Sequence, residues 1–187
     1  MNSKLISQEG ILSAGKELVA QGGITALSIR TIAQRCNISV GSVYNYFPSK
    51  GELLITTIES IWQEIIYDEQ TMPRELGFSD HILYLFNNIQ KGFEKYPAFF
   101  TVHPMSLAQA QKKSGRAVMQ HYFTGMKDGL LKALQQDPHA KKELFSDTFT
   151  PPDFVDFIFS NILTLLMQGN PSCDHLLEIV RRVVYEE

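Results

Sequence analysis

Three helix stops lie close together in residues 7–55 of this 187-residue chain, and they constrain its fold more than any other feature. Gly22-Gly23 can end a first helix, because glycine adopts the left-handed C-cap conformation without a steric penalty. Asn37 is one of the few non-glycine residues that tolerate a positive φ, and Pro48 cannot continue a helical hydrogen-bond ladder. Since no alternation of period two is sustained, the segment predicts several short helices rather than strands.

Helix starts follow these stops. Ser28 and Ser39 have the kind of side chain that commonly caps a helix N-terminus. Ser49-Lys50-Gly51-Glu52 has the pattern of a capping box, in which the first and last side chains bind backbone amides. The predicted helices are 7–21, a short one that begins at Ser28, 40–46, and a long one from Lys50 to about Gln70.

The helix predicted over Val40 to Tyr46 has a thin apolar edge and a small, polar face. Val43 and Phe47, at i and i+4, would form the buried edge. The residues left for the other face are Gly41, Ser42, Tyr44, Asn45 and Tyr46. A helix-turn-helix needs such a second helix, because it must enter a DNA major groove about 12 Å wide. Small residues let the backbone approach the bases, and Tyr and Asn can hydrogen-bond phosphates or base edges.

The charge distribution favours DNA binding at the N-terminal end. The whole chain has a net charge of −3, which by itself argues against a nucleic-acid partner. Residues 1–50, however, hold five basic and two acidic residues, whereas the remainder holds 12 basic and 18 acidic ones. A small cationic segment therefore precedes an acidic body.

Residues 7–55 resemble the N-terminal domain of the tetracycline-repressor (TetR) family. The resemblance rests on Ile32-Ala33, on Tyr44-Asn45-Tyr46-Phe47 and on Ser49-Lys50-Gly51-Glu52-Leu53-Leu54, which stand in the expected register. It implies DNA contacts from Ser28, Arg30, Gly41, Ser42, Tyr44, Asn45, Tyr46 and Lys50. Lys50 has a separate reason, because the N-terminus of a helix favours an anion such as a phosphate. As alternatives, Arg30 could simply be solvated, and the two tyrosines could be ordinary surface residues.

The remainder of the chain also predicts helices, so the expected fold class is all-α. We expect a three-helix DNA-binding domain over 1–55 and a larger helical domain over 56–187 for effector binding and dimerisation. Thr71-Met72-Pro73-Arg74 looks like a boundary, and 137–150 like a loop. Further helices are predicted near 79–96, 98–112, 114–136, 152–168 and 173–186, with start signals at Ser79, Ser114, Pro151-Pro152 and Ser172.

Aromatic residues are frequent in the C-terminal part and could line a pocket for a small apolar or aromatic ligand. The candidates are Phe86, Phe93, Phe100, His103, Met119, Tyr122 and Phe123. The alternative for each aromatic residue is a place in the bundle core, and His103 could equally lie on the surface.

The last two predicted helices carry large apolar faces that could pair with a second copy of the chain. These faces hold Phe154, Phe157, Ile158, Ile162, Leu165 and Leu166 on the first helix and Leu176, Leu177, Val180, Val183 and Val184 on the second. In the resembled family this pair forms the dimer interface. A dimer would also place two recognition helices in successive major grooves, roughly 34–36 Å apart.

The sequence therefore predicts a cytoplasmic, homodimeric repressor that binds a palindromic operator and is released by a small molecule. The alternative is a DNA-binding regulator without a small-molecule effector. We expect no enzyme activity and no cofactor, because no catalytic constellation is recognisable. Cys36 and Cys173 lie far apart without a metal-ligand pattern, so no metal site is expected. No apolar run has the length of a membrane span or a signal peptide.

Overall fold

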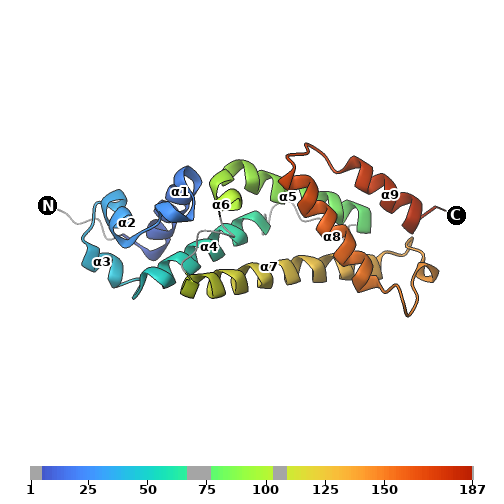
Figure 1. Ribbon diagram of the computed structural model, residues 1–187, viewed down its shortest axis with the longest axis horizontal. Helices are drawn as coiled ribbons and strands as arrows, with labels where there is room; N and C mark the ends of the chain where they lie inside the picture. The colour runs from blue at the N-terminus through green and yellow to red at the C-terminus, as the bar shows by residue number, and fades with distance from the viewer. Residues whose placement is uncertain (1–5, 67–76, 103–108, 187) are drawn as a thin grey trace. The chain divides into compact units, whose positions relative to one another are not determined.

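The computed structural model describes residues 6–66, 77–102 and 109–186, and of the helical residues between 101 and 116 it describes the backbone only. The regular elements of this part are helices (Figure 1). Apart from an isolated bridge between Ser146 and Phe149, these residues form no β-structure, which confirms the predicted all-α class. None of the described helices is long and apolar enough to cross a membrane.

The described α-helices are α1 (Gln8–Gly22), α2 (Ile29–Cys36), α3 (Val40–Tyr44), α4 (Lys50–Ile66), α5 (Phe78–Lys95), α6 (Pro97–Val102), α7 (Gln109–Gln136), α8 (Pro151–Met167) and α9 (Asp174–Val184). Two short 3-10 helices join them, η1 (Ile24–Ala26) and η2 (Lys142–Leu144). η2 lies inside the stretch 137–150 that the sequence predicts as a loop.

Helix α3 is shorter than predicted, because it ends at Tyr44 instead of Tyr46. Beyond Asn45 the chain tightens into a turn in which the Tyr46 amide donates to the Val43 carbonyl at 3.0 Å. Pro48 explains the early end, since a residue before proline is disfavoured in helical conformation and the last turn contracts ahead of it.

The helices after residue 96 also differ from the prediction. Ser114 lies inside α7 and starts no helix, because no glycine or proline precedes it closely enough to end the helical run. The predicted helix 98–112 is described only as α6 and the start of α7. Cys173, not Ser172, is the N-cap of α9. The predicted end of α4 near Gln70 and the boundary at 71–74 lie outside the described residues.

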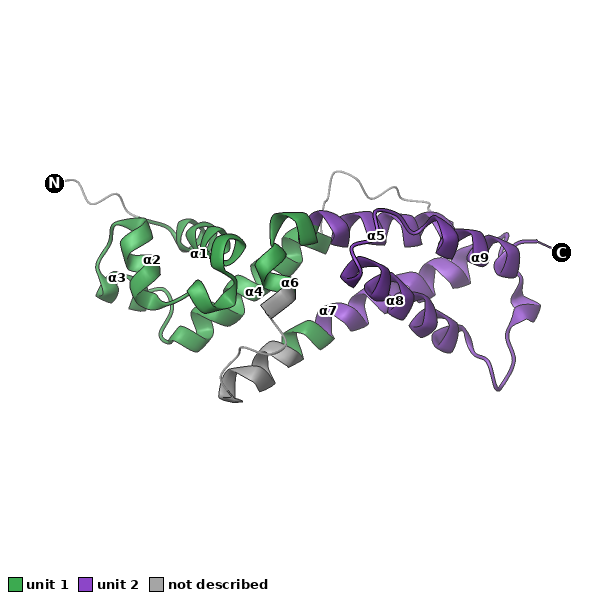
Figure 2. Cartoon of the chain, turned by 45° about the horizontal axis from the view of Figure 1, so that its top comes forward, with its two compact units in different colours: residues 1–67, 92–120 green, residues 68–91, 121–187 purple. Residues whose placement is uncertain are grey.

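The chain forms two compact units, and neither is continuous in sequence (Figure 2). The first comprises residues 1–67 and 92–120, and the second comprises residues 68–91 and 121–187. The predicted functional division at residue 55 stays a prediction.

In the first unit, α1, α2, α3 and α4 enclose a core of aliphatic residues. Ile11, Ile32, Val43, Leu53 and Ile58 are fully buried. Gly15 of α1 lies against the Thr57 side chain of α4, where a Cβ would come within 3.1 Å of the Thr57 hydroxyl. Helix α1 also packs on α2, and α2 packs on α3, so α1 connects the two short helices to α4.

In the second unit, residues 78–91 of α5, residues 121–136 of α7, and helices α8 and α9 form a bundle with an aromatic centre. Phe78 packs on Phe154 with ring centroids 5.9 Å apart, and Phe123 meets Phe159 edge to face at 5.2 Å. Thr150 caps α8, and its hydroxyl accepts from the Asp153 amide at 3.3 Å while the Asp153 carboxylate accepts from the Thr150 amide. Pro151 and Pro152 therefore occupy the first helical positions, where a missing amide costs nothing.

Candidate nucleic-acid interface

Helices α2 and α3 are joined by a tight turn whose caps hold the angle between them. Ser28 and Thr31 form a reciprocal capping box at the start of α2, with distances of 3.1 and 2.9 Å. Asn37 ends α2 with φ 53, and its conformation lets the Ile38 amide reach the Ala33 carbonyl at 3.0 Å. Ser39 then caps α3 by accepting from the Ser42 amide at 3.0 Å. The predicted caps at Ser28 and Ser39 and the predicted positive φ of Asn37 are confirmed.

Helix α3 has the thin buried edge that the sequence predicts. Val43 is 0% exposed and Phe47 is 1% exposed. Gly41, Tyr44 and Asn45 lie on the exposed side, and 47% of the Tyr44 surface is accessible. The helix is therefore anchored along one narrow line and presents the rest of its surface to solvent.

Three of the predicted DNA-contacting side chains already hold hydrogen bonds within the protein. The Ser28 hydroxyl caps α2, and the Ser42 hydroxyl lies 2.8 Å from that of Ser39. The Tyr46 hydroxyl donates to the Ile6 carbonyl at 2.6 Å. Since a phenol has a single proton to donate, the phosphate contact predicted for Tyr46 would require this bond to break.

The remaining predicted contacts are exposed. Arg30 lies in the first turn of α2, and Lys50 is the first residue of α4. Val40, which is not among the predicted DNA contacts, is 42% exposed on α3. Its position four residues before Tyr44 could have indicated it, since i and i+4 share a helix face. An apolar side chain there suits a thymine methyl group in the major groove.

Ion pairs within the protein leave only some of the basic side chains in residues 1–50 free to bind another molecule. Lys16 forms an ion pair with Glu64 at 2.6 Å, and Arg35 forms one with Glu17 at 2.9 Å. Among the described residues of this segment, Arg30 and Lys50 are the basic residues for which no ion pair is present. The positive charge available to DNA is therefore concentrated at the starts of α2 and α4.

The Glu64 carboxylate on α4 accepts hydrogen bonds from three side chains of the first unit, one on α1 and two where α5 meets α6. Its Oε2 accepts from Lys16 of α1, and its Oε1 accepts from Lys95 of α5 and from the Tyr96 hydroxyl at 3.1 Å. Burial alone would raise the pKa of the Glu64 carboxyl, but the two lysines outweigh it and lower that pKa. Burial beside Glu64 raises the pKa of the Tyr96 hydroxyl, which therefore stays protonated and donates.

Helix α6 packs directly against the end of α1, the short helix η1 and α4. Gly23, with φ 68, lies against Ala98, where a Cβ would come within 3.1 Å of the Ala98 carbonyl oxygen. Trp62 of α4 meets Phe99 and Phe100 of α6 edge to face, at 5.9 and 5.6 Å. The first unit is thus a helix-turn-helix module extended by the end of α5, by α6 and by the start of α7.

The predicted effector-binding residues are distributed over both units. In the first, Phe93 and Phe100 stack with centroids 3.9 Å apart, and Met119 is half-buried. In the second, Phe86 is fully buried, and Tyr122 and Phe123 are half-buried. His103 lies outside the described residues. A ligand role for these side chains stays a prediction.

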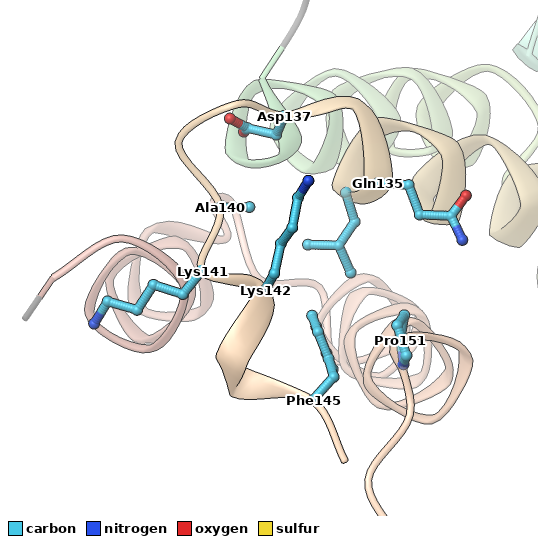
Figure 3. A pocket seen from close by; sticks show the side chains of 8 residues that line it. Gln135, Asp137, Ala140, Lys141, Lys142, Phe145 and Pro151 are labelled. Carbon is cyan, nitrogen blue, oxygen red and sulfur yellow. The ribbon is translucent and has the colours of Figure 1, made fainter. Parts of the chain in front are cut away.

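A pocket of about 220 Å³ lies in the second unit, at the end of α7 (Figure 3). The residues that line it are Leu134, Gln135, Asp137, Ala140, Lys141, Lys142, Phe145 and Pro151. None of the predicted effector-binding residues is among them. No group of three His, Cys, Asp or Glu side chains in the described part of the chain is placed to hold a metal ion.

Comparison with known proteins places the helix-turn-helix in a family. Residues 11–57 match the TetR N-terminal family, described as bacterial regulatory proteins of the tetR family. The HTH-type transcriptional repressor KstR of Rhodococcus jostii is 34% identical over 64 residues, which cover 34% of this chain and 30% of that protein. The matched stretches span less than a third of the length of the curated relatives.

Solved structures match over nearly the whole chain, at identities that show the fold alone. A transcriptional regulator from Rhodococcus sp. Rha1 has a TM-score of 0.72 at 13% identity, covering 96% of this chain and 98% of its own. The transcriptional regulator FadR from Bacillus subtilis, solved in complex with stearoyl-CoA, has a TM-score of 0.63 at 16% identity. That match covers 97% of this chain and 100% of its own.

Proposed function

We propose that this chain, which belongs to the TetR family of bacterial regulatory proteins, is a homodimeric repressor. It would bind a palindromic operator and leave it when a small ligand binds. The observation that carries the proposal is the capped turn between α2 and α3, which exposes Gly41, Tyr44 and Asn45 on a helix anchored by Val43 and Phe47. That shape suits major-groove entry.

The exposed side chains divide into two kinds of DNA contact. Tyr44, Asn45 and Val40 would reach base edges from α3, and Gly41 would let the backbone approach. Arg30 and Lys50 would neutralise phosphates, because both are exposed cations without an ion pair and lie near helix N-termini. Ser28, Ser42 and Tyr46 would act by holding the module together, in keeping with their internal hydrogen bonds.

A second copy of the chain would pack on the outer faces of α8 and α9. Most of the apolar residues predicted for this interface are instead buried within the protomer. Phe154 and Val180 are examples. Two of the predicted interface residues are left outside, Phe157 at 55% exposed and Val183 at 37% exposed, and Ile179, which was not predicted, is 53% exposed. Exposed apolar residues on adjoining helices are typical of a protein interface. We therefore assign dimerisation to this outer set.

The proposed effector is a small, mainly apolar molecule. Half-buried aromatic residues of the second unit, Tyr122 and Phe123, support this class. Because FadR from Bacillus subtilis was solved with stearoyl-CoA, long-chain acyl compounds are the first set to screen, both as free fatty acids and as acyl-CoA thioesters, in which a large charged group is joined to the apolar chain. Release would follow if the ligand prefers a conformation that the operator does not fit. A regulator without a small-molecule effector is the second candidate, because Phe86 is fully buried, Phe93 and Phe100 stack on each other, and no predicted effector-binding residue lines the pocket at the end of α7.

DNA selection from a random library tests the proposal. The wild type should enrich a palindromic site and bind it at nanomolar concentration. Tyr44→Ala should lose about 1–3 kcal/mol of binding free energy for that site. Lys50→Ala should weaken binding to all sequences and reduce the salt slope by about one. Lys142→Ala, which removes an exposed lysine from the second unit, is the matched control and should bind as the wild type does. Equal, weak and sequence-independent binding by all four proteins would contradict the proposal.

A further inference from the structure

The pocket of about 220 Å³ in the second unit lies where α7 ends and α8 begins (Figure 3). Four of the residues that line it are apolar: Leu134, Ala140, Phe145 and Pro151. They belong to the last turn of α7, to the segment that follows and to the first residue of α8. Pockets for drug-sized ligands measure about 300–1,000 Å³, so this smaller pocket suits a molecule with a single ring.

The wall that Phe145 forms is held in place by its neighbours. The centroid of its ring lies 6.0 Å from that of Phe149 and 6.1 Å from that of Phe154. Ser146 and Phe149 exchange two backbone hydrogen bonds, at 3.0 and 3.3 Å, which close the turn directly after Phe145. A wall that is already fixed need not be ordered when a ligand binds, so less binding free energy is lost to ordering.

Lys142 supplies a positive charge to this pocket. It is exposed, and it takes part in none of the ion pairs among the described residues. Its side chain runs along the pocket, whereas the side chain of Lys141 points away (Figure 3). An ammonium group without an anionic partner favours a ligand that carries a carboxylate, because the hydrogen bond between them is strengthened by both charges.

The carboxylate in the lining, that of Asp137, is already occupied by donors within the protein. Asp137 is 6% exposed, and its oxygens accept from the Phe78 and His139 amides and from the Tyr185 hydroxyl. It is therefore a poor partner for a ligand cation, while its negative charge disfavours a second charge on an anion. The lining thus favours a monoanion over a cation and over a dianion.

We propose that this pocket is a ligand site, separate from the predicted effector-binding residues, that takes a small aromatic monocarboxylate. The ring would lie against Leu134 and Phe145, and the carboxylate would meet Lys142. The Ala140 and Phe145 amides make long backbone bonds, of 3.3 and 3.4 Å. We therefore expect residues 140–145 to open easily in the free protein and to be protected by a ligand that touches α7, this segment and α8 together.

Three probes of similar shape and different charge test the site on the whole chain. They are para-fluorobenzoate, para-fluorobenzyl alcohol and para-fluorobenzylamine, and fluorine NMR titration gives the Kd of each. Lys142→Met removes the charge and keeps a long side chain, and Ala140→Leu fills part of the pocket. Lys132→Met, at an exposed position of α7 outside the lining, is the matched control. Circular dichroism checks that each variant is folded.

The wild type should bind para-fluorobenzoate with a Kd on the order of 1 mM, and the alcohol and the amine more weakly. Lys142→Met should weaken binding of the benzoate by about fivefold, as expected for an exposed ion pair, and should leave binding of the alcohol unchanged. Ala140→Leu should weaken binding of both, and Lys132→Met should change neither. The benzoate should also slow amide hydrogen exchange over residues 140–145.

The site is overturned if the wild type does not bind the benzoate, or if binding is unchanged in both Lys142→Met and Ala140→Leu. An equal loss of affinity in Lys132→Met, or tighter binding of the amine, overturns the role of Lys142. If Ala140→Leu does not fold, Lys142→Met and the exchange measurement still decide. None of these measurements uses DNA, so their outcome is independent of the proposed repressor function.

Discussion

The Tyr185 hydroxyl donates to Asp137 Oδ2 at 2.7 Å, and this bond ties the end of the described chain to the end of α7. The same carboxylate accepts from the Phe78 amide at 2.8 Å and, through Oδ1, from the His139 amide at 2.9 Å. Asp137 is buried, and these three donors satisfy its carboxylate. Phe78 is the first residue of α5, so the contact also places a negative charge at the positive end of a helix dipole.

Replacing Asp137 by Asn should lower the free energy of unfolding by about 2 kcal/mol, because an amide nitrogen then faces buried donors. Urea denaturation of the wild type and the variant measures the difference. Asp147→Asn is the control, since Asp147 is exposed and makes no contact of this kind. A change below about 0.5 kcal/mol would show that water replaces the lost acceptor.

The stabilisation by Asp137 should disappear in acid. Burial alone would raise the pKa of this carboxyl, but the hydrogen bonds from Tyr185, Phe78 and His139 lower it below its ordinary value of 3.8. A depressed pKa in the folded state stabilises the protein above the ordinary value, and this contribution is lost as the pH falls through the lowered value. The difference in unfolding free energy between wild type and Asp137→Asn should therefore shrink from pH 7 to pH 3, whereas a constant difference would contradict this assignment.

Two glycines should respond to alanine with opposite signs. Gly23→Ala places a Cβ at φ 68 and against the Ala98 carbonyl, so it should cost about 2 kcal/mol of stability. Gly125 lies inside α7, and the Cβ that Gly125→Ala adds would have no atom within 4 Å. This substitution should raise the free energy of unfolding by roughly 0.5–1 kcal/mol. Thermal or urea unfolding of both variants gives the two signs directly. If Gly23→Ala stabilised the protein, the contact between Ala98 of α6 and the turn at Gly23 would be contradicted.

The two cysteines should differ in reactivity. Cys173 is 1% exposed, and burial together with Asp174 raises its pKa to about 11. Cys36 is half-buried, and burial and Glu17 raise its pKa as well. A thiol reagent at pH 8 should therefore modify Cys36 slowly and Cys173 only after unfolding, since the thiolate is the reactive form. In Cys36→Ser, native labelling should vanish; rapid labelling of that variant would place Cys173 at an accessible surface.

Aspartate at the outer face of α8 or α9 should convert the proposed dimer to monomers. Phe157→Asp and Ile179→Asp would each bury an unpaired carboxylate in the interface. This burial should cost several kcal/mol of dimerisation free energy. Leu83→Asp is the control, because Leu83 is an exposed apolar residue of α5, 38% accessible, outside those helices. Sedimentation or light scattering gives the mass of each variant. Dimers that persist in both α8 and α9 variants would exclude this surface.

The sequence by itself determined the helix-turn-helix, because its boundaries depend on local backbone chemistry. Ser28 and Ser39 cap the predicted helices, Asn37 adopts its predicted positive φ, and Val43 and Phe47 form the predicted buried edge. Each of these features follows from one side chain or from an i, i+4 spacing, so no knowledge of distant segments is needed.

Only the tertiary structure decided which apolar side of α8 faces inward. Phe154, Phe157 and Ile158 lie within a turn or so of each other, and a helix with apolar residues on several sides has no periodicity that separates core from surface. The packing of Phe78 on Phe154 turns Phe157 outward. Glu64 is a second case, since its partners lie at least 31 residues away. Such contacts depend on how whole helices meet, and no local sequence pattern records that.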